Sequence, residues 1–261
     1  MADPVLSIVT PSYNQADFVE ECIRSVRDQS YDDVEHIVVD GGSTDGTAEI
    51  LERCEDDYDL RWVSEPDDGQ SNAVNKGIRM ADGDWIGWQN SDDFYLDGAF
   101  EAFDDARRAN PDADVVYGDV VVVDENGQRL RRLYQTRPSK FVHRYWSLFA
   151  RNQATFLSRE VFETVGYLDE DLVYAMDEDL FWRVLNADLE LMNVPESLGA
   201  FRVQAEGKTQ QRQADAWSDE RRQIYDQTLF SRTLPRRVLG PLGKAVKGLS
   251  LLSEGRWGAF R

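Results

Sequence analysis

The sequence predicts an α/β protein with a mostly parallel sheet, an antiparallel excursion, helices on both faces and a helical C-terminal tail. Three observations indicate this class. At 261 residues the chain is long enough to bury a sizeable core. Over its first half, short apolar runs alternate with segments of helical period, which is typical of β-α-β units. Farther on, apolar runs flank the pair Asn126 and Gly127, which favours an antiparallel hairpin.

The first half alternates predicted strands with predicted helices. Four apolar runs have the length of strands: 6–10, 36–40, 60–63 and 85–88. Three segments between them have apolar residues at helical spacing: 18–26, 48–54 and about 70–81. We expect the first strand to end at Pro11 and Asn14 to cap the first helix. The four strands should lie parallel, because each is followed by a helix that can cross back over the sheet.

The second half departs from this alternation. Its strand-like runs are 115–117, 120–123 and 129–134. A helix should follow Ser158 and end at Gly166, because glycine favours the backbone conformation that ends a helix. A second helix should begin at Asp177, and one more is expected near 214–230.

The composition excludes several classes of protein. The net charge is −20, which repels nucleic acid backbones, and no apolar run is long enough to predict a membrane-spanning helix. The acids are 31 Asp and 18 Glu, whereas the bases are 24 Arg and only 5 Lys. Dense short carboxylates keep a protein hydrated in concentrated salt, so we expect a halophilic source. No signal peptide is recognisable, so we expect a cytoplasmic protein whose Cys22 and Cys54 are buried free thiols.

Polar residues gather directly after the predicted strands, where open parallel sheets bind their ligands. The four clusters are 10–14, 40–47, 65–71 and 89–93. The glycines match no phosphate-loop or dinucleotide motif, so a carboxylate such as Asp40 is the better candidate to contact a nucleoside. The adjacent Asp92 and Asp93 suit a hard divalent cation, Mn²⁺ or Mg²⁺. The residues alone therefore indicate a nucleoside-diphosphate compound bound through a metal.

Four segments in order resemble the successive motifs of family 2 glycosyltransferases with the GT-A fold: 7–14, 40–47, 65–77 and 90–93. The resemblance extends from residue 5 to about 205. It implies a metal-dependent, inverting transfer of one sugar from a nucleoside-diphosphate sugar to a hydroxyl of a glycan or lipid-linked acceptor. It also implies a nucleotide-sugar-binding half and an acceptor-binding half of one domain, followed by a separate basic tail. The expected bounds of these three parts are 1–114, 115–206 and 207–261.

By this resemblance Asp40 contacts the donor base, Asp93 binds the metal directly, and Asp92 lies nearer the ribose. The implied donor-binding residues are Pro11, Tyr13, Asp40, Asp68, Asn75, Lys76 and Asp92. Where the family often has a metal-binding histidine, this chain has Gln204, a weaker oxygen donor. We therefore expect the metal to have few protein ligands. His36 and His143 do not fit a metal site and should be structural.

Residues 175–183 resemble the family's acidic motif at a helix start, which implies that Asp177 is the general base. An inverting transfer needs one carboxylate to take the proton of the attacking hydroxyl, and a helix N-terminus favours an ionised carboxylate. The alternative is that Asp177 is only an N-cap. The resemblance puts Gln153 in the acceptor region, and Glu178 and Trp182 complete the expected acceptor side. As catalysts Glu178 and Asp179 are poor candidates, because first-turn acids are usually solvated.

The C-terminal tail has its own charge pattern. Residues 231–261 carry a net charge of +6, whereas the first 230 residues carry −26. Bases mixed with apolar residues fit an amphipathic element on an anionic membrane. That element would hold the protein on the inner face of the cell membrane, near a polyprenyl-phosphate-linked acceptor. The alternative is that the tail docks on its own acidic domain, and five glycines between 240 and 258 argue against a strong helix.

Two other functions are compatible with the sequence. A sugar nucleotidyltransferase has a similar sheet but usually opens with a glycine-rich loop bearing Arg or Lys, which 10–14 lacks. A degenerate nucleotide-binding or scaffold domain would not need the set Asp40, Asp92, Asp93 and Asp177, although Gln204 leaves room for it. The favoured setting is protein glycosylation or surface polysaccharide synthesis in a halophilic archaeon.

Overall fold

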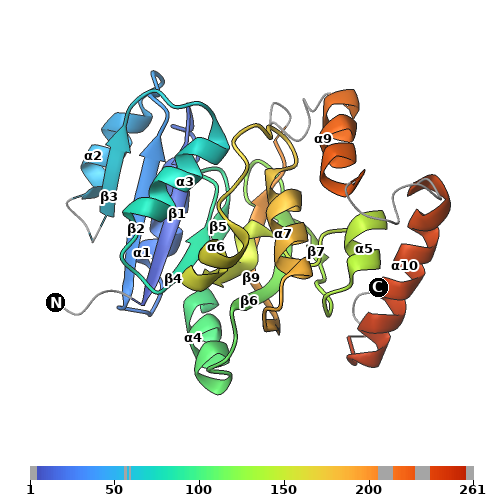
Figure 1. The fold of residues 1–261 in the computed structure, drawn as a ribbon. Helices are drawn as coiled ribbons and strands as arrows, with labels where there is room; N and C mark the ends of the chain where they lie inside the picture. The colour runs from blue at the N-terminus through green and yellow to red at the C-terminus, as the bar shows by residue number, and fades with distance from the viewer. Residues whose placement is uncertain (1–4, 56–57, 59, 205–213, 227–235, 257–261) are drawn as a thin grey trace.

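The computed structural model describes residues 5–55, 58, 60–204, 214–226 and 236–256 (Figure 1). Within these residues, nine strands form one mixed sheet. Its order is β3-β2-β1-β4-β8-β6-β9-β5, with β7 paired to β6. The sheet continues from the first half of the chain into the second, so both halves share one scaffold.

Four parallel strands make up the first part of the sheet, as predicted. They are β1 (Leu6–Ser12), β2 (Val34–Asp40), β3 (Leu60–Ser64) and β4 (Trp85–Trp88). β1 lies between β2 and β4, and β2 also pairs with β3. Because the strands are parallel, their carboxyl ends share one edge. The polar clusters that follow the strands therefore come together there.

The antiparallel excursion is confirmed and is larger than the sequence indicated. The remaining strands are β5 (Phe94–Tyr95), β6 (Val115–Val123), β7 (Arg129–Leu133), β8 (Thr155–Ser158) and β9 (Leu191–Arg202). β6 and β7 form the predicted hairpin, and β8 lies antiparallel between β4 and β6. β8 was not predicted, because it runs directly into α6 (Arg159–Val165) without a polar loop that would mark its end. Its position brings the short 3₁₀ helix η1 (Asn152–Ala154) beside the end of β4.

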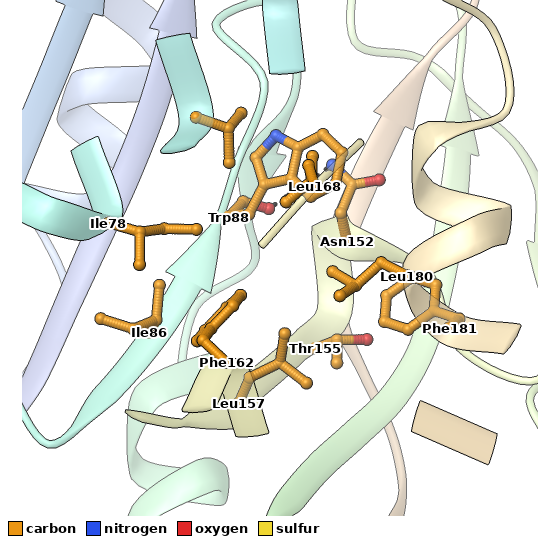
Figure 2. Close-up of a pocket in the computed structure, with 11 residues that line it drawn as sticks. Ile78, Ile86, Trp88, Asn152, Thr155, Leu157, Phe162, Leu168, Leu180 and Phe181 are labelled. Carbon is orange, nitrogen blue, oxygen red and sulfur yellow. Dashed lines mark hydrogen bonds between the residues drawn. The ribbon is translucent and has the colours of Figure 1, made fainter. Parts of the chain in front are cut away.

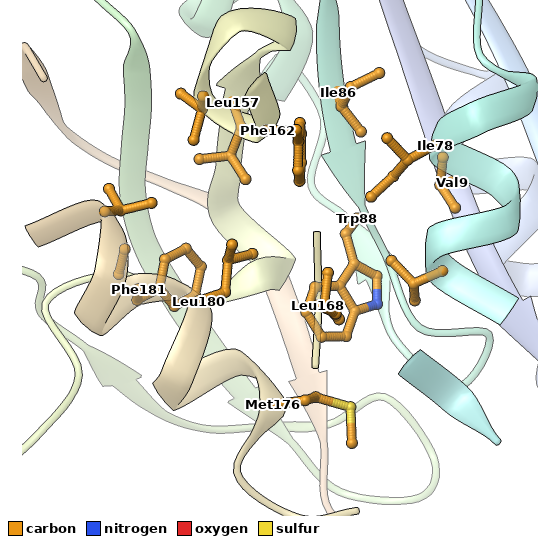
Figure 3. Close-up of a cluster of buried hydrophobic side chains, with 14 of the residues drawn as sticks. Val9, Ile78, Ile86, Trp88, Leu157, Phe162, Leu168, Met176, Leu180 and Phe181 are labelled. Atoms are coloured by element: carbon orange, nitrogen blue, oxygen red, sulfur yellow. The ribbon is translucent and has the colours of Figure 1, made fainter. Parts of the chain in front are cut away.

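Helices cover both faces of the sheet, as predicted. They are α1 (Val19–Arg27), α2 (Thr47–Glu55), α3 (Gln70–Met80), α4 (Ala99–Ala109), α6 (Arg159–Val165) and α7 (Met176–Asn186). Along β2, Ile37 and Val39 join the core under α3, α6 and α7, which Figure 3 shows in part. Val38 points to the other face and packs with α1 and α2. α4 was not predicted, although Phe100 and Phe103 anchor it in the core.

A small cavity lies in the core beneath α3, α6 and α7 (Figure 2). Nine of its eleven lining side chains are apolar, and the two polar ones are Asn152 and Thr155. A nucleotide or sugar needs several convergent polar groups, so this cavity is a gap in the packing and not the ligand site.

Two predicted boundaries near the first strand were wrong. β1 continues through Pro11. β4 pairs with β1 only as far as Val9, so no backbone N–H is needed at position 11, where proline has none. Asn14 does not cap α1, since Phe18 occupies that position. Instead Asn14 adopts a positive φ of 51° and accepts a hydrogen bond from the Thr44 N–H at 2.9 Å. It thereby joins the two loops that follow β1 and β2.

The C-terminal segment is helical and lies on the protein itself (Figure 1). The remaining helices are α5 (Lys140–Tyr145), α9 (Ala214–Asp226) and α10 (Arg236–Ser253). α10 packs against α5, and a Cβ on Gly243 would lie 2.9 Å from Cβ of Trp146. The glycines were expected to weaken this helix, whereas here Gly243 allows a close approach. No helix in the described ranges is long and apolar enough to cross a membrane.

Candidate functional site

Asp40 ends β2 with a buried carboxylate that accepts four hydrogen bonds. Its Oδ2 accepts from the N–H groups of Gly42 and Ser43 at 3.2 and 2.9 Å and from the Ser64 hydroxyl at 2.6 Å. Its Oδ1 accepts from the Ser43 hydroxyl alone. Asp40 therefore shapes the loop after β2, and its Oδ1 keeps a lone pair for one further donor.

The second carboxylate group follows β4. Asp93 is 1% exposed, and it accepts hydrogen bonds from the N–H of Arg202 at 2.8 Å and from the side-chain amides of Asn90 and Gln153 at 3.1 and 2.8 Å. Asp92 accepts from the Gln204 amide at 2.9 Å. Burial raises the pKa of both aspartates, and the charge of Asp92 raises the pKa of Asp93 further.

These donors fit a divalent cation. Neither Asp92 nor Asp93 forms an ion pair with a basic side chain in the described part of the chain, so a bound cation would relieve their mutual repulsion. Mg²⁺ and Mn²⁺ prefer oxygen ligands, and Mg²⁺ is commonly held by one or two carboxylates plus substrate phosphates. Among the described residues there is no group of three or more His, Cys, Asp or Glu that could hold a metal. Gln204 donates its amide to Asp92, so in this arrangement it supports a ligand more than it offers its own oxygen.

Gln153 connects the donor edge to the second half of the protein. It lies in η1 and is 4% exposed, and its Nε2 donates to Asp93. Its Oε1 has no hydrogen-bond partner among the described residues. A buried oxygen without a partner costs about 1–3 kcal/mol, which a donor from substrate or water would recover. The residue expected on the acceptor side thus contacts the expected metal ligand.

Asp177 lies in the first turn of α7 and is not its N-cap, because Ala175 occupies the cap position. Its Oδ1 accepts a hydrogen bond from the Glu178 N–H at 2.7 Å. Burial raises the pKa of Asp177, and the positive charge of Arg151 is the first influence that opposes the rise. The charges of Asp177 and Asp93 in turn act on Arg151, where they oppose the lowering of its pKa by burial.

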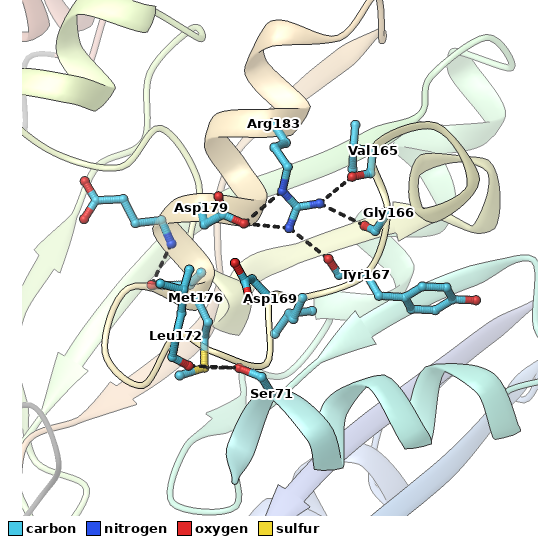
Figure 4. Close-up of polar contacts among 12 residues, drawn as sticks. Ser71, Val165, Gly166, Tyr167, Asp169, Leu172, Met176, Asp179 and Arg183 are labelled. Atoms are coloured by element: carbon cyan, nitrogen blue, oxygen red, sulfur yellow. Dashed lines mark hydrogen bonds and ion pairs between the residues drawn. The ribbon is translucent and has the colours of Figure 1, made fainter. Parts of the chain in front are cut away.

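Hydrogen bonds and an ion pair hold the loop before α7, which leads to Asp177 in the first turn of that helix. Arg183 donates to the carbonyls of Gly166 and Tyr167 at 3.1 and 2.9 Å and pairs with Asp179 at 2.8 Å (Figure 4). Ser71 at the start of α3 donates to the carbonyl of Leu172 at 3.3 Å.

Asn75 on α3 holds the same loop. Its Nδ2 donates to the Leu168 carbonyl at 2.9 Å and to Glu170 at 2.8 Å, and its Oδ1 accepts from the Leu168 N–H at 3.0 Å. Both ends of the amide are therefore in use. Asn75 thus helps to position the loop, and its expected contact with the donor stays a prediction.

Two expected acceptor-side residues hold helices together. Glu178 is 4% exposed, forms an ion pair with Arg221 and accepts the hydroxyl of Tyr225, both on α9. It is buried and not solvated. Trp182 stacks on His143 with ring centroids 5.7 Å apart and meets Tyr225 edge-on at 5.0 Å. These contacts fix α7 to α5 and α9, and an acceptor contact by either residue stays a prediction.

The remaining expected donor residues lie at or near the carboxyl edge of the sheet. Tyr13 is 61% exposed there, Pro11 is buried in β1, and Asp68 is exposed. Lys76 forms an ion pair with Glu65.

Two residues of this edge were not predicted. Asp67, next to Asp68, lies with its carboxylate against Gly41 in the loop after β2. Arg202 donates its N–H to Asp93 and its Nε to the carbonyl of Asp92 at 2.9 Å. The position of Arg202 in the sequence could have indicated a place at this edge, because Arg202 stands two residues before Gln204 at the end of the last core strand.

Both histidines are structural, as expected. His36 is buried between Thr10, at 2.8 Å, and Tyr58, and burial lowers its pKa to about 3. His143 meets the carbonyl of Glu178 at 3.3 Å, and burial also lowers its pKa to about 3. Cys22 and Cys54 are buried free thiols, which confirms the prediction.

Comparison with known proteins identifies similar sequences. The model of the family described as "Glycosyl transferase family 2" matches residues 7–167. The "Uncharacterized glycosyltransferase EpsJ" of Bacillus subtilis is 30% identical over 196 residues, which cover 67% of this chain and 54% of that protein. A "PGL/p-HBAD biosynthesis glycosyltransferase" of Mycobacterium bovis is 33% identical over 181 residues, 64% of each chain. The chain thus spans about half of the length of EpsJ.

Solved structures share the fold. Residues 1–349 of S. aureus TarS in complex with UDP-GlcNAc match with a TM-score of 0.67 and 17% identity, over 90% of this chain and 69% of that one. The mannosyltransferase PcManGT of Pyrobaculum calidifontis, in complex with GDP-Man and Mn²⁺, matches with a TM-score of 0.65 and 17% identity, over 100% and 82%. The predicted fold class, α/β with a curled and mostly parallel GT-A sheet, is therefore confirmed.

Proposed function

The chain belongs to glycosyl transferase family 2, and on that basis we propose that it transfers one sugar, with inversion, from a nucleoside-diphosphate sugar to a hydroxyl of a glycan or lipid-linked acceptor. The observation that carries the proposal is the buried pair Asp92 and Asp93 at the end of β4. Gln153 joins this pair to the half of the protein that contains Asp177.

The donor would bind at the carboxyl edge of β1, β2 and β4. We propose that the base lies near the loop shaped by Asp40, with the exposed ring of Tyr13 beside it. The diphosphate would lie at Asp92 and Asp93. The complexes of TarS with UDP-GlcNAc and of PcManGT with GDP-Man support a nucleotide sugar as the donor class.

In the proposed reaction the Asp177 carboxylate takes the proton of the acceptor hydroxyl while its oxygen bonds to the anomeric carbon. The bond from that carbon to the diphosphate breaks on the opposite side, and the electron pair leaves with the diphosphate. A divalent metal held by Asp93, with Asp92 beside it, would neutralise the charge that builds on this leaving group. Gln153 holds Asp93 in place, and the charge of Arg151 favours the ionised form of Asp177.

Calorimetric titration of the full chain with UDP, GDP and dTDP, each with and without Mn²⁺, tests this function. We expect one nucleotide to bind in a metal-dependent way. The variant Asp93→Asn should lose the metal dependence, whereas the exposed Asp112→Asn should behave as the wild type. If no nucleotide binds to folded protein, the degenerate binding module becomes the better reading.

We further propose that the outer face of α10 contacts an anionic membrane and brings the protein to a lipid-linked acceptor. Leu242, Val246 and Leu249 are exposed by 53%, 37% and 67% on one side of the helix. The helix carries four basic residues and no acidic one, which suits an anionic surface. α10 is docked on α5. The same helix would therefore contact both the protein itself and the membrane, which the sequence left as alternatives.

Vesicle sedimentation tests the membrane contact. Binding to vesicles rich in phosphatidylglycerol should be lost when Leu242, Val246 and Leu249 are all changed to Ser, and kept in Leu130→Ser, which removes an exposed leucine of β7. Deletion of α10 is a poorer test, because Arg256 just after it pairs with the buried Asp119. Equal sedimentation of the triple variant and the wild type would contradict the contact.

The acidic surface leads us to propose that the protein works in concentrated salt. With a net charge of −20, screening by salt should relieve self-repulsion in the folded state. The midpoint of thermal unfolding should therefore rise steadily as potassium chloride is raised to molar concentration. A midpoint that does not change with salt would remove the argument for a halophilic source.

A further inference from the structure

One face of α9 packs against the body of the protein, although this helix lies beyond residues 7–167, which match the family model. The apolar residues of α9 that pack in the core are Trp217, Ile224 and Tyr225. With 3.6 residues per helical turn, Glu220 and Arg221 fall on the same face. α9 therefore turns two charged side chains toward the protein, and both have partners on α7 or in the loop before it.

Glu220 holds the end of the loop that leads into α7. Its Oε1 accepts a hydrogen bond from the N–H of Val173 at 3.0 Å, and its Oε2 accepts from the N–H groups of Tyr174 and Ala175, each at 2.9 Å. Three consecutive backbone N–H groups thus use both oxygens of one carboxylate. Hydrogen bonds to an ionised group are about twice as strong as those between neutral groups. A single side chain thereby holds the last three residues before α7 begins at Met176.

The start of α7 depends on this outside contact. Its N-cap residue is Ala175, whose side chain cannot accept a hydrogen bond, whereas Ser, Thr, Asp and Asn at this position commonly bind the first N–H groups of a helix. The N–H of Asp179 donates to the carbonyl of Ala175 at 2.9 Å, so the position of Ala175 sets the first turn. The negative charge of Glu220 also suits the positive end of the α7 dipole.

Asp177 lies in the turn that this contact begins, two residues after Ala175. α3 holds the backbone of the same loop farther back, where the Leu172 carbonyl accepts from the Ser71 hydroxyl. Glu220 holds the residues between Leu172 and α7. A shift of Ala175 would therefore move the carboxylate of Asp177, and a misplacement of about 1 Å at a catalytic group can lower a rate about 10²-fold.

The place of α9 itself does not depend on Glu220. Arg221 forms an ion pair with Glu178 and donates to the carbonyl of Arg144 at 2.9 Å. Tyr225 donates its hydroxyl to Glu178 and is buried in the core. Loss of the Glu220 carboxylate should therefore free the end of the loop while α9 stays docked, so an effect on the loop can be separated from an effect on the fold.

We propose that Glu220 is a positioning residue for the candidate base. It fixes the segment 173–175 and, through it, the direction in which Asp177 meets the acceptor hydroxyl. α9 is then part of the catalytic machinery and not part of a separate tail. The inference rests on the proposed transferase function for the role of Asp177. In this arrangement Glu220 acts through the backbone and touches neither substrate, so its loss should lower turnover and leave donor binding unchanged.

The test compares full-length Glu220→Ala and Glu220→Gln with Asp219→Ala, which removes the exposed neighbouring carboxylate. Calorimetry measures the binding of UDP and GDP with Mn²⁺. Turnover is measured as the nucleotide released from UDP-GlcNAc or GDP-Man with octyl glucoside as the probe acceptor, at a temperature where circular dichroism shows each variant folded. Amide hydrogen exchange of the peptide 168–178 follows the contact itself without any substrate.

In Glu220→Ala we expect the amides of 173–175 to exchange at least about 10-fold faster and kcat to fall at least about 10-fold, while the Kd of the nucleotide changes less than about 2-fold. Glu220→Gln keeps one acceptor oxygen and should be intermediate. Asp219→Ala should match the wild type in all three measurements.

Unchanged exchange or an unchanged kcat in folded Glu220→Ala would overturn the proposal. Equal losses of kcat and nucleotide binding would also overturn it, because α9 would then support the whole domain and not the base. Faster exchange in Glu220→Ala, when the wild type binds no nucleoside diphosphate, would keep Glu220 as the residue that orders this segment and refute the transferase function.

Discussion

Gly199 in β9 controls the position of Gln153, and Gly199→Ala should therefore impair the candidate site without removing any polar side chain. A Cβ at this position would lie 1.7 Å from the carbonyl oxygen of Gln153 and 2.7 Å from its carbonyl carbon. Side-chain Cβ atoms keep at least 3.0 Å from such neighbours. Either β9 or η1 must therefore move by about 1.3 Å, and both are backbone segments held by the sheet.

The hydrogen bond from Gln153 to Asp93 is 2.8 Å long, and a shift of this size away from Asp93 would break it. Forcing a methyl group into a packed site costs about 1–3 kcal/mol, and loss of a hydrogen bond to a charged group costs about 1.5–3 kcal/mol. We expect Gly199→Ala to lower the free energy of unfolding by about 3 kcal/mol, which is a fall of about 6–12 °C in the unfolding midpoint.

Sugar transfer by Gly199→Ala should fall by about 10²-fold, because a misplacement of 1 Å at a catalytic group has effects of that size. Thermal unfolding and initial rates of transfer measure the two effects. Gly240→Ala is the matched control, since its Cβ would meet the Tyr145 carbonyl at an ordinary 3.5 Å. Gly240→Ala should be neutral or slightly stabilising. A Gly199→Ala protein with wild-type stability and rate would refute the reasoning.

Three further predictions concern charged groups. Asp177→Asn should bind the donor normally but lose about 10²–10⁴-fold in the transfer rate, and a near-normal rate would assign the base elsewhere. Arg151→Met removes the charge that favours ionised Asp177, so the pKa of Asp177 should rise further; because the base works when ionised, the acidic limb of the kcat profile should move to higher pH. If the acidic limb of the kcat profile stays at the wild-type pH, Arg151 does not influence the pKa of Asp177. Glu178→Gln removes the negative charge that pairs with Arg221, whose side chain is 12% exposed, and should cost about 3–5 kcal/mol in urea unfolding, while Asp219→Asn, in an exposed pair on α9, should cost less than about 1 kcal/mol.

Local patterns were sufficient for the parallel part of the fold. β1 to β4 are short, mostly apolar runs, and polar loops follow Val34–Asp40 and Trp85–Trp88 directly. Since the carboxyl ends of parallel strands share an edge, the pattern also brought Asp40 and Asp93 to one side. The alternation of Ile37, Val38 and Val39 between two cores follows from the two-residue period of a strand.

Side-chain roles were less predictable, because they depend on partners far away in the sequence. Asn75 and Trp182 match family motifs, yet their hydrogen bonds and ring contacts go to the α6–α7 loop and to α9. Glu178 has the position of a solvated first-turn acid, but α9 covers it and supplies Arg221. No local pattern reports which distant element will lie over a given helix face.

The sequence by itself determined the α/β class, the edge that carries the acidic clusters and the family to which the chain belongs. These features follow from periodicity and from motifs that are local in the chain. Only the tertiary structure decided that Gln153 contacts Asp93 and that α10 packs against α5. Such contacts join residues dozens to a hundred positions apart, and they form only where packing of the sheet and its helices brings those residues within reach.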